Sequence, residues 1–173
     1  MQRYPSGCIL FDWGNTLMRE FNEFSGPMKD WPYVQALPGA AEMLAALRPD
    51  WTLALATNAD VSDEADIWAA LQRVGLDQWL DKVYCFKKIG CKKPSIEFYQ
   101  YILVDLKLVP RSVCMVGDNF MTDVLGANAC GLRAFWFNEH SLDVRDNDLH
   151  RTIHELKALP VVLREFMRLP NPE

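Results

Sequence analysis

The sequence lacks any apolar run of the length needed to cross a bilayer, which takes about 20 consecutive residues. Its first residues also lack the pattern of a secretory signal peptide, in which positive charge precedes an apolar stretch. These two absences predict a cytoplasmic protein with no membrane partner.

Cysteine pairs, a basic balance and nucleotide-binding loops are missing as well. The five cysteines are odd in number and include no C-x-x-C pair, which argues against a disulfide framework and a zinc knuckle. The formal net charge of −5 disfavours a nucleic-acid partner, because such proteins usually present a basic face. Neither G-x-x-x-x-G-K-[ST] nor G-x-G-x-x-G occurs, which disfavours the common nucleotide-binding enzymes.

What the sequence does contain is an alternation of strand-like and helix-like segments in 173 residues, half of them hydrophobic. This length fits one domain over residues 1–173 with a substantial core. The alternation predicts a three-layer α/β/α sandwich, with a doubly wound, Rossmann-like parallel sheet of about five strands. The expected strands are 8–11, 51–56, 82–86, 113–116 and 133–137, and the expected helices are 38–47, 60–74, 95–106, 120–130 and 151–167, the last interrupted at Pro160.

Polar residues follow the expected strands, at the edge where open parallel sheets bind ligands. Asp12 follows the first strand, Thr57-Asn58 the second and Asp118 the fourth, and Lys93 lies between the third and the fourth. Two carboxylates at neighbouring strand ends can hold Mg²⁺. A hydroxyl, turn amides and a lysine can hold a phosphate, and an aspartate beside both can act as a nucleophile.

Four short motifs in this order resemble the haloacid dehalogenase superfamily of hydrolases, most of which are phosphatases. They are an apolar strand with Asp-x-x-x-Thr, a strand with Thr-Asn, a lysine before proline, and Gly-Asp followed by a second aspartate. In this chain they fall at Asp12 to Thr16, Thr57-Asn58, Lys93-Pro94, and "VGDNFMTD" with Asp118 and Asp123. The resemblance covers nearly the whole chain and implies an Mg²⁺-dependent phosphatase that hydrolyses a phosphoric monoester or an acyl phosphate.

The resemblance implies a nucleophile and a metal site at the first and fourth motifs. Asp12 attacks phosphorus and forms an aspartyl phosphate. Asp12 and Asp118 bind Mg²⁺, together with the backbone carbonyl of Gly14. A carboxylate can approach a phosphate dianion only when a metal and a lysine cancel the repulsion between them.

The resemblance also implies how the phosphoryl group is held. Thr57, Asn58 and nearby backbone amides contact its oxygens, and Lys93 neutralises charge between the nucleophile and the phosphate. Asp123 orients Lys93 or a metal-bound water. Trp13 adjoins the nucleophile in sequence, and we expect it to line the substrate site.

Position 14 departs from the family pattern, in which most phosphatases carry a second aspartate as general acid and base. Gly14 keeps a carbonyl for the metal but lacks this group, which is typically worth about 10²–10⁴ in rate. Three interpretations stay open: a substrate with a good leaving group, a substitute acid such as the nearby Asp60, or a phosphoryl-binding regulatory module with little turnover. Dehalogenases of the family also lack this aspartate, so a dehalogenase is a further, less favoured alternative.

Residues 18–37 are too few for the cap domain that covers the site in many family members. They number about 20, against the roughly 50 of a small domain. We therefore expect a capless member in which residues 18–37 form a short flap or loop. Its aromatic side chains either cover the site, contact another subunit of a homo-oligomer, or pack within the loop; they are Phe21, Phe24, Trp31 and Tyr33.

Overall fold

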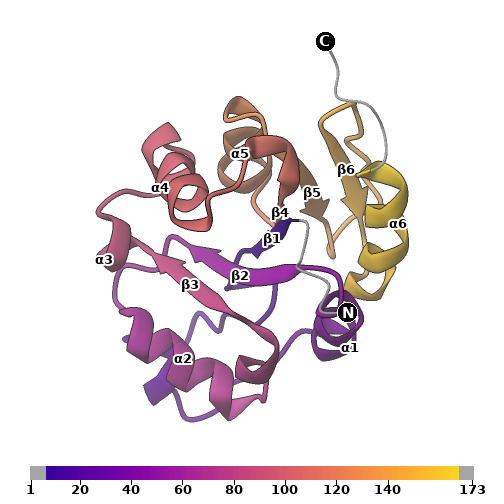
Figure 1. Cartoon of the computed structure of the whole chain (residues 1–173). Coiled ribbons are helices and arrows are strands. Elements are labelled where there is room, and N and C mark those ends of the chain that lie inside the picture. Colours follow the sequence, from indigo (N-terminus) through magenta and orange to yellow (C-terminus); the bar gives the residue numbers. More distant parts are fainter. Residues whose placement is uncertain (1–6, 168–173) are drawn as a thin grey trace.

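A six-stranded sheet organises the computed structural model, which describes residues 7–167, and every neighbouring pair of its strands is parallel. The strand order is β3-β2-β1-β4-β5-β6, so the first strand lies inside the sheet and later strands extend the sheet in both directions (Figure 1). This confirms the doubly wound architecture, with six strands rather than about five. The strands are β1 Cys8–Phe11, β2 Thr52–Thr57, β3 Lys82–Cys85, β4 Val113–Gly117, β5 Arg133–Phe137 and β6 His150–Ile153.

Helices cover both faces of the sheet, and each face has its own buried cluster. The helices α1 (Ala40–Leu47), α2 (Glu64–Arg73) and α6 (Leu159–Phe166) contribute to one cluster. The helices α4 (Ile96–Leu106) and α5 (Gly126–Ala129) contribute to the other, and the short helix α3 (Phe86–Ile89) directly follows β3. The predicted three-layer sandwich is therefore confirmed.

The strand β1 shows why the central strands read as unbroken apolar runs. Ile9 and Phe11 pack into one cluster, and Cys8 and Leu10 pack into the other. Successive side chains of a strand point to opposite faces, so a strand buried on both faces needs an apolar residue at every position. This strand ends where Asp12 begins the functional edge of the sheet.

The segment 151–167 departs from the prediction of an interrupted helix. Its first residues form β6, which pairs with β5, and α6 begins only at Leu159. Pro160 lies in the first turn of α6, where a residue without an N–H costs nothing, so it marks the start of the helix and does not interrupt it. The β-branched Thr152 and Ile153 suit the strand.

The predicted helix 120–130 is also different in detail. A π-helical turn over Phe120–Leu125 precedes α5, and Asn119 begins it by accepting the N–H groups of Met121 and Thr122, both at 3.1 Å. Such turns are rare and frequently occur at functional sites. The turn carries Asp123, one of the motif aspartates.

Residues 18–37 form a closed loop that contains one short 3₁₀ helix, Met28–Asp30. Met18 pairs with Ala36 at the base of the loop, and Arg73 donates hydrogen bonds to backbone carbonyls within it, including that of Trp31 at 2.7 Å. The loop aromatics contact one another, with ring centroids 4.8–6.4 Å apart. The rings thus pack within the loop, and Trp31 also lines the cavity that holds Asp12, as a covering flap would.

Across residues 7–167, the structure has no helix that is both long enough and apolar enough to cross a membrane.

Candidate active site

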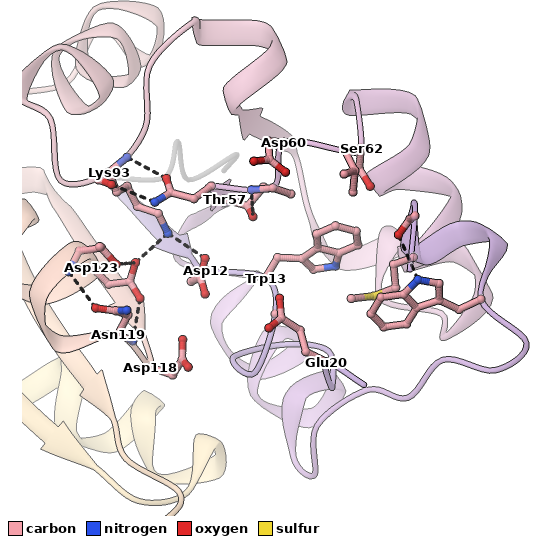
Figure 2. Close-up of a pocket in the computed structure, with 18 residues that line it drawn as sticks. Asp12, Trp13, Glu20, Thr57, Asp60, Ser62, Lys93, Asp118, Asn119 and Asp123 are labelled. Atoms are coloured by element: carbon pink, nitrogen blue, oxygen red, sulfur yellow. Dashed lines mark hydrogen bonds and ion pairs between the residues drawn. The ribbon is translucent and has the colours of Figure 1, made fainter. Parts of the chain in front are cut away.

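A cavity of about 420 Å³ opens at the carboxyl ends of β1, β2 and β4 (Figure 2). All the site residues that the sequence singled out line this one cavity, although they come from four separate motifs. They are Asp12, Trp13, Gly14, Thr57, Asn58, Lys93, Asp118 and Asp123. Open parallel sheets commonly bind ligands at this edge.

The first and fourth motifs are joined through backbone and hydroxyl contacts. The N–H of Asp12 donates to the carbonyl of Val116 at 2.9 Å, which continues the ladder between β1 and β4. The Thr16 hydroxyl accepts the N–H of Asp118 at 3.2 Å and lies 3.5 Å from its carboxylate oxygen Oδ1. The threonine of the first motif thus has a physical role, because it fixes Asp118 beside Asp12.

Lys93 is a fully desolvated ammonium group in the centre of the site. Its Nζ donates to Asp12 Oδ1 at 2.8 Å, to Asp123 Oδ1 at 2.7 Å and to the carbonyl of Ala56 at 2.6 Å. Only 1% of its side chain is exposed. Burial opposes the charge, but the two carboxylates outweigh it and hold the pKa of Lys93 above its ordinary value. Lys93 is therefore a fixed positive charge beside Asp12.

Asn58 and Gly117 hold Lys93 and Asp123 in position. Asn58 donates from Nδ2 to the carbonyl of Lys93 at 2.9 Å and accepts its N–H at 2.8 Å, so the amide clamps the lysine backbone. A Cβ at position 117 would lie 2.1 Å from Asp123 Oδ2, so only glycine leaves room for that carboxylate. The structure shows the Asn58 amide bound to the backbone of Lys93, so its contact with substrate remains a prediction.

Three carboxylates converge beside Lys93. One oxygen from each of Asp12, Asp118 and Asp123 lies within 4.8 Å of the others. Burial, with the charges of Asp12 and Asp123, raises the pKa of Asp118 to about 7. Burial and the charge of Asp12 raise the pKa of Asp123 to about 6, although Lys93 acts in the opposite direction. The cluster thus carries more negative charge than Lys93 alone offsets, and hard oxygen donors in this arrangement suit a small divalent cation.

Thr57 and Trp13 form other parts of the cavity wall. The Thr57 hydroxyl accepts the N–H of Ala59 at 3.1 Å, in the turn that follows β2. The Trp13 ring is almost fully buried, and its Nε1 donates to the sulfur of Met18 at 3.1 Å. Trp13 therefore has a packing role as well as its place in the wall.

Asp60, the substitute acid suggested by proximity in the sequence, lies on the rim of the cavity. Its carboxylate accepts from Lys92 Nζ at 2.8 Å, and 58% of its side chain is exposed. The hydrogen bond and charge of Lys92 hold the pKa of Asp60 below its ordinary value. Asp60 is thus kept ionised, which is the wrong state for donating a proton.

Glu20 is a cavity residue that the sequence analysis missed. It follows a tight turn in which the backbone of Asn15 adopts a positive φ of 54°, and this turn returns the chain to Gly14. A Cβ at position 14 would lie only 2.1 Å from Glu20 Oε1. Partial burial and the charge of Asp12 raise the pKa of Glu20 above its ordinary value. No family motif marks position 20, and the only clue in the sequence was the glycine that makes room for it.

A family model described as haloacid dehalogenase-like hydrolase matches residues 21–131, which is more than half of the chain. This range holds the second, third and fourth motifs, while the first lies just before it.

Comparisons with individual proteins point the same way. Pyrimidine 5'-nucleotidase YjjG of Escherichia coli is 32% identical over 128 residues, which cover 71% of this chain and 56% of the relative. The chain spans about half the length of the curated relatives it matches.

Solved structures share the fold. An uncharacterized protein from Listeria monocytogenes superposes with a TM-score of 0.83 over 94% of this chain and 99% of its own, at 22% identity. A 2-haloacid dehalogenase from Pseudomonas syringae is 29% identical, with a TM-score of 0.63 over 77% of this chain and 55% of its own. With the motif residues assembled in one cavity, the chain belongs to the haloacid dehalogenase-like hydrolases.

Proposed function

We propose that this protein is an Mg²⁺-dependent phosphatase that transfers a phosphoryl group from its substrate to Asp12 and then to water. The observation that carries the proposal is the buried Lys93 ammonium, which contacts Asp12 and Asp123 in a cavity that also holds Asp118. This arrangement lowers the repulsion that a phosphate dianion meets as it approaches a carboxylate.

The chain's own residues divide the work. Asp12 Oδ1 accepts the Lys93 bond, and we assign the other oxygen, Oδ2, to attack phosphorus. That attack breaks the bond to the leaving oxygen and forms an aspartyl phosphate. Attack by water then releases inorganic phosphate and restores the carboxylate of Asp12. Thr57 faces the cavity and its hydroxyl proton is free to donate to a phosphoryl oxygen. Lys93, whose three N–H groups are already engaged, offsets the negative charge from beside Asp12.

Mg²⁺ fits the cluster that contains Asp12 and Asp118, and Gly14, whose backbone carbonyl we assign as a further ligand, lines the same cavity. The fit rests on the three convergent carboxylates, where burial and the neighbouring negative charges raise the pKa values of Asp118 and Asp123. When bound, Mg²⁺ supplies positive charge that stabilises the oxygens of the transferring phosphoryl group. The similarity to a nucleotidase favours the phosphatase over the dehalogenase.

The direct test is release of inorganic phosphate from acetyl phosphate, an aryl phosphate and a sugar phosphate, each with Mg²⁺ and with a chelator. We expect Mg²⁺-dependent release from at least one of them. Equal release with the chelator would contradict the role of the metal. Absence of release from all three, with a phosphate analogue still bound, would replace the phosphatase by the phosphoryl-binding module.

Mg²⁺ should also stabilise the fold in a pH-dependent way. The cation must displace the proton of Asp118, whose pKa is about 7, and the neighbouring Asp123, with a pKa of about 6, attracts the cation most strongly when ionised. Each displaced proton costs up to about tenfold in affinity per pH unit below its pKa. We therefore expect a larger rise of the unfolding midpoint at about pH 8 than at about pH 5.5.

Thermal unfolding with millimolar MgCl₂ measures this effect, with NaCl of equal ionic strength as the control. The variant Asp118→Asn should lose most of the Mg²⁺ response. The metal site would be wrong if the midpoint rose equally at both pH values and in both proteins.

A further inference from the structure

We propose that Glu20 is the general acid and base of this site, a role that position 14 cannot fill. This inference rests on the proposed phosphatase function and adds the proton-transfer step to it. Its basis is the position of the Glu20 carboxylate, which lies over Gly14 in the wall of the cavity that contains Asp12.

The glycine and the glutamate fit one another. A Cβ at position 14 would lie 2.1 Å from Glu20 Oε1, 2.5 Å from its Cδ and 2.7 Å from its Cγ. The glutamate therefore occupies the volume that a side chain at position 14 would enter. A bulkier residue there would displace the carboxylate from this part of the cavity.

Local contacts bring Glu20 to this place. Its N–H donates to Asn15 Oδ1 at 3.1 Å, and its Oε2 accepts from Asn15 Nδ2 at 3.3 Å. The preceding residue, Arg19, fixes the base of the loop, because its N–H donates to the carbonyl of Gln35 at 2.8 Å. Figure 2 shows Glu20 beside Trp13, with Asp12 between this pair and the group of Lys93 and Asp123.

The charges around the two carboxylates suit two different roles. The Lys93 ammonium donates a hydrogen bond to Asp12 and holds its carboxylate in place for attack. Among the ion pairs of residues 7–167, none involves Glu20, and its carboxylate is held by a single long bond to a neutral amide. When two carboxylates of one site lie in different surroundings, one can act as the nucleophile while the other acts as the acid.

Other carboxylates of the cavity are already engaged. Asp123 accepts from Lys93, and Asp60 pairs with Lys92 on the rim. Asp118 belongs to the cluster of three carboxylates, whereas Glu20 stands outside it. Glu20 is also exposed at the mouth of the cavity, where the leaving group of a bound phosphate would reach it.

Two proton transfers by Glu20 complete the reaction. In the first step Asp12 Oδ2 forms a bond to phosphorus, the bond between phosphorus and the leaving oxygen breaks, and the Glu20 carboxylic acid gives its proton to that oxygen. In the second step the Glu20 carboxylate takes a proton from water as the water oxygen attacks phosphorus. The bond to Asp12 breaks, inorganic phosphate leaves, and both side chains return to their starting states.

The test compares Glu20→Gln with the parent protein on two phosphoric monoesters that differ in the leaving group. Glycerol phosphate releases a poor leaving group that needs a proton, and para-nitrophenyl phosphate releases one that does not. We expect kcat/KM to fall by about 10²–10⁴ for glycerol phosphate and by less than about tenfold for para-nitrophenyl phosphate. This ratio reports on the steps up to formation of the aspartyl phosphate, so a purely structural effect would lower both values alike.

A relocation experiment tests the same idea independently. Glu20→Ala removes the acid, and Gly14→Asp in the same chain supplies a carboxyl in the vacated volume. We expect the double variant to recover glycerol phosphate turnover at least about tenfold over Glu20→Ala alone. Gly14→Asp alone should bring no such gain, because the two carboxylates then compete for one volume. Glu23→Gln, at an exposed position of the same loop, is the matched control and should leave kcat/KM unchanged for both substrates.

The outcomes separate the two proposals. An active parent whose Glu20→Gln variant slows both substrates equally, or neither, overturns the role of Glu20 and leaves the phosphatase standing. An active parent that hydrolyses only para-nitrophenyl phosphate also overturns it. A parent that hydrolyses neither ester nor acetyl phosphate removes the proposed function, and the role of Glu20 falls with it.

Discussion

Replacing Asp12 by asparagine should reduce phosphate release by at least about 10³-fold on every substrate, because the amide cannot attack phosphorus. Steady-state release with Mg²⁺ measures the loss. Acid quenching of the parent during turnover should trap a phosphorylated chain that the variant does not form. Unlike Glu20→Gln, this change should not discriminate between leaving groups.

The fold should survive this change. The asparagine side chain still offers an oxygen to Lys93, and removal of one charge relieves the repulsion that, together with burial, raises the pKa of Asp118. We therefore expect the free energy of unfolding to stay within about 1 kcal/mol of the parent. Loss of activity through unfolding would instead appear as a large drop of the unfolding midpoint.

Asp60→Asn is the matched control for Asp12→Asn, since it makes the same chemical change at the rim of the same cavity. Its ion pair with Lys92 is exposed, and such pairs contribute little to the free energy of unfolding. Near-parental activity of Asp60→Asn would also argue against Asp60 as a substitute acid. Retained Mg²⁺-dependent turnover in Asp12→Asn would sink the nucleophile assignment.

The fold was predictable because its central strands are short, apolar and buried on both faces. Cys8–Phe11 and the later apolar runs fit few folds other than a parallel sheet covered on both faces. The polar residues that follow these runs marked the functional edge of that sheet. The sixth strand was missed because His150–Ile153 is partly polar and pairs only with β5 at the edge of the sheet, so it lacks the apolar run of a central strand.

The site was predictable as far as its residues stand at strand ends. Asp12 and Asp118 are placed by the register of β1 and β4, which any parallel sheet with these strands would produce. Glu20 is different, because it reaches the cavity only through the turn at Asn15 and the pairing of Met18 with Ala36. A loop conformation of this kind has no periodic signature in the sequence. The one indication was Gly14, whose missing side chain leaves space for another residue.

Lys93→Met should be the most damaging change to stability at this site. It leaves the buried carboxylate of Asp123 and the partly buried Asp12 without their shared cation. Removing one member of a buried ion pair costs about 3–5 kcal/mol. For a chain of this size that corresponds to a fall of roughly 6–20 °C in the unfolding midpoint. Activity should fall by at least about 10²-fold, as when one electrostatic stabiliser of a transition state is removed.

The pH dependence of that loss identifies its cause. The pKa of Asp123 is already raised to about 6 in the folded state, and loss of the Lys93 charge raises it further above its unfolded value. The folded variant therefore binds more protons than the unfolded chain between those two values, and its stability must fall as pH rises through that window. We expect the penalty to be small near pH 4 and largest near pH 8, so a variant that is unfolded at about pH 8 can still be measured at about pH 5.

Lys92→Met provides the control, because the neighbouring lysine undergoes the same substitution in an exposed pair with Asp60. It should cost no more than about 1 kcal/mol and should show no comparable pH dependence. If both variants lost equal stability, the effect would come from the loop that carries them. A penalty confined to Lys93→Met and growing with pH would instead come from charge neutralisation, the same property that lets this cavity receive a phosphate.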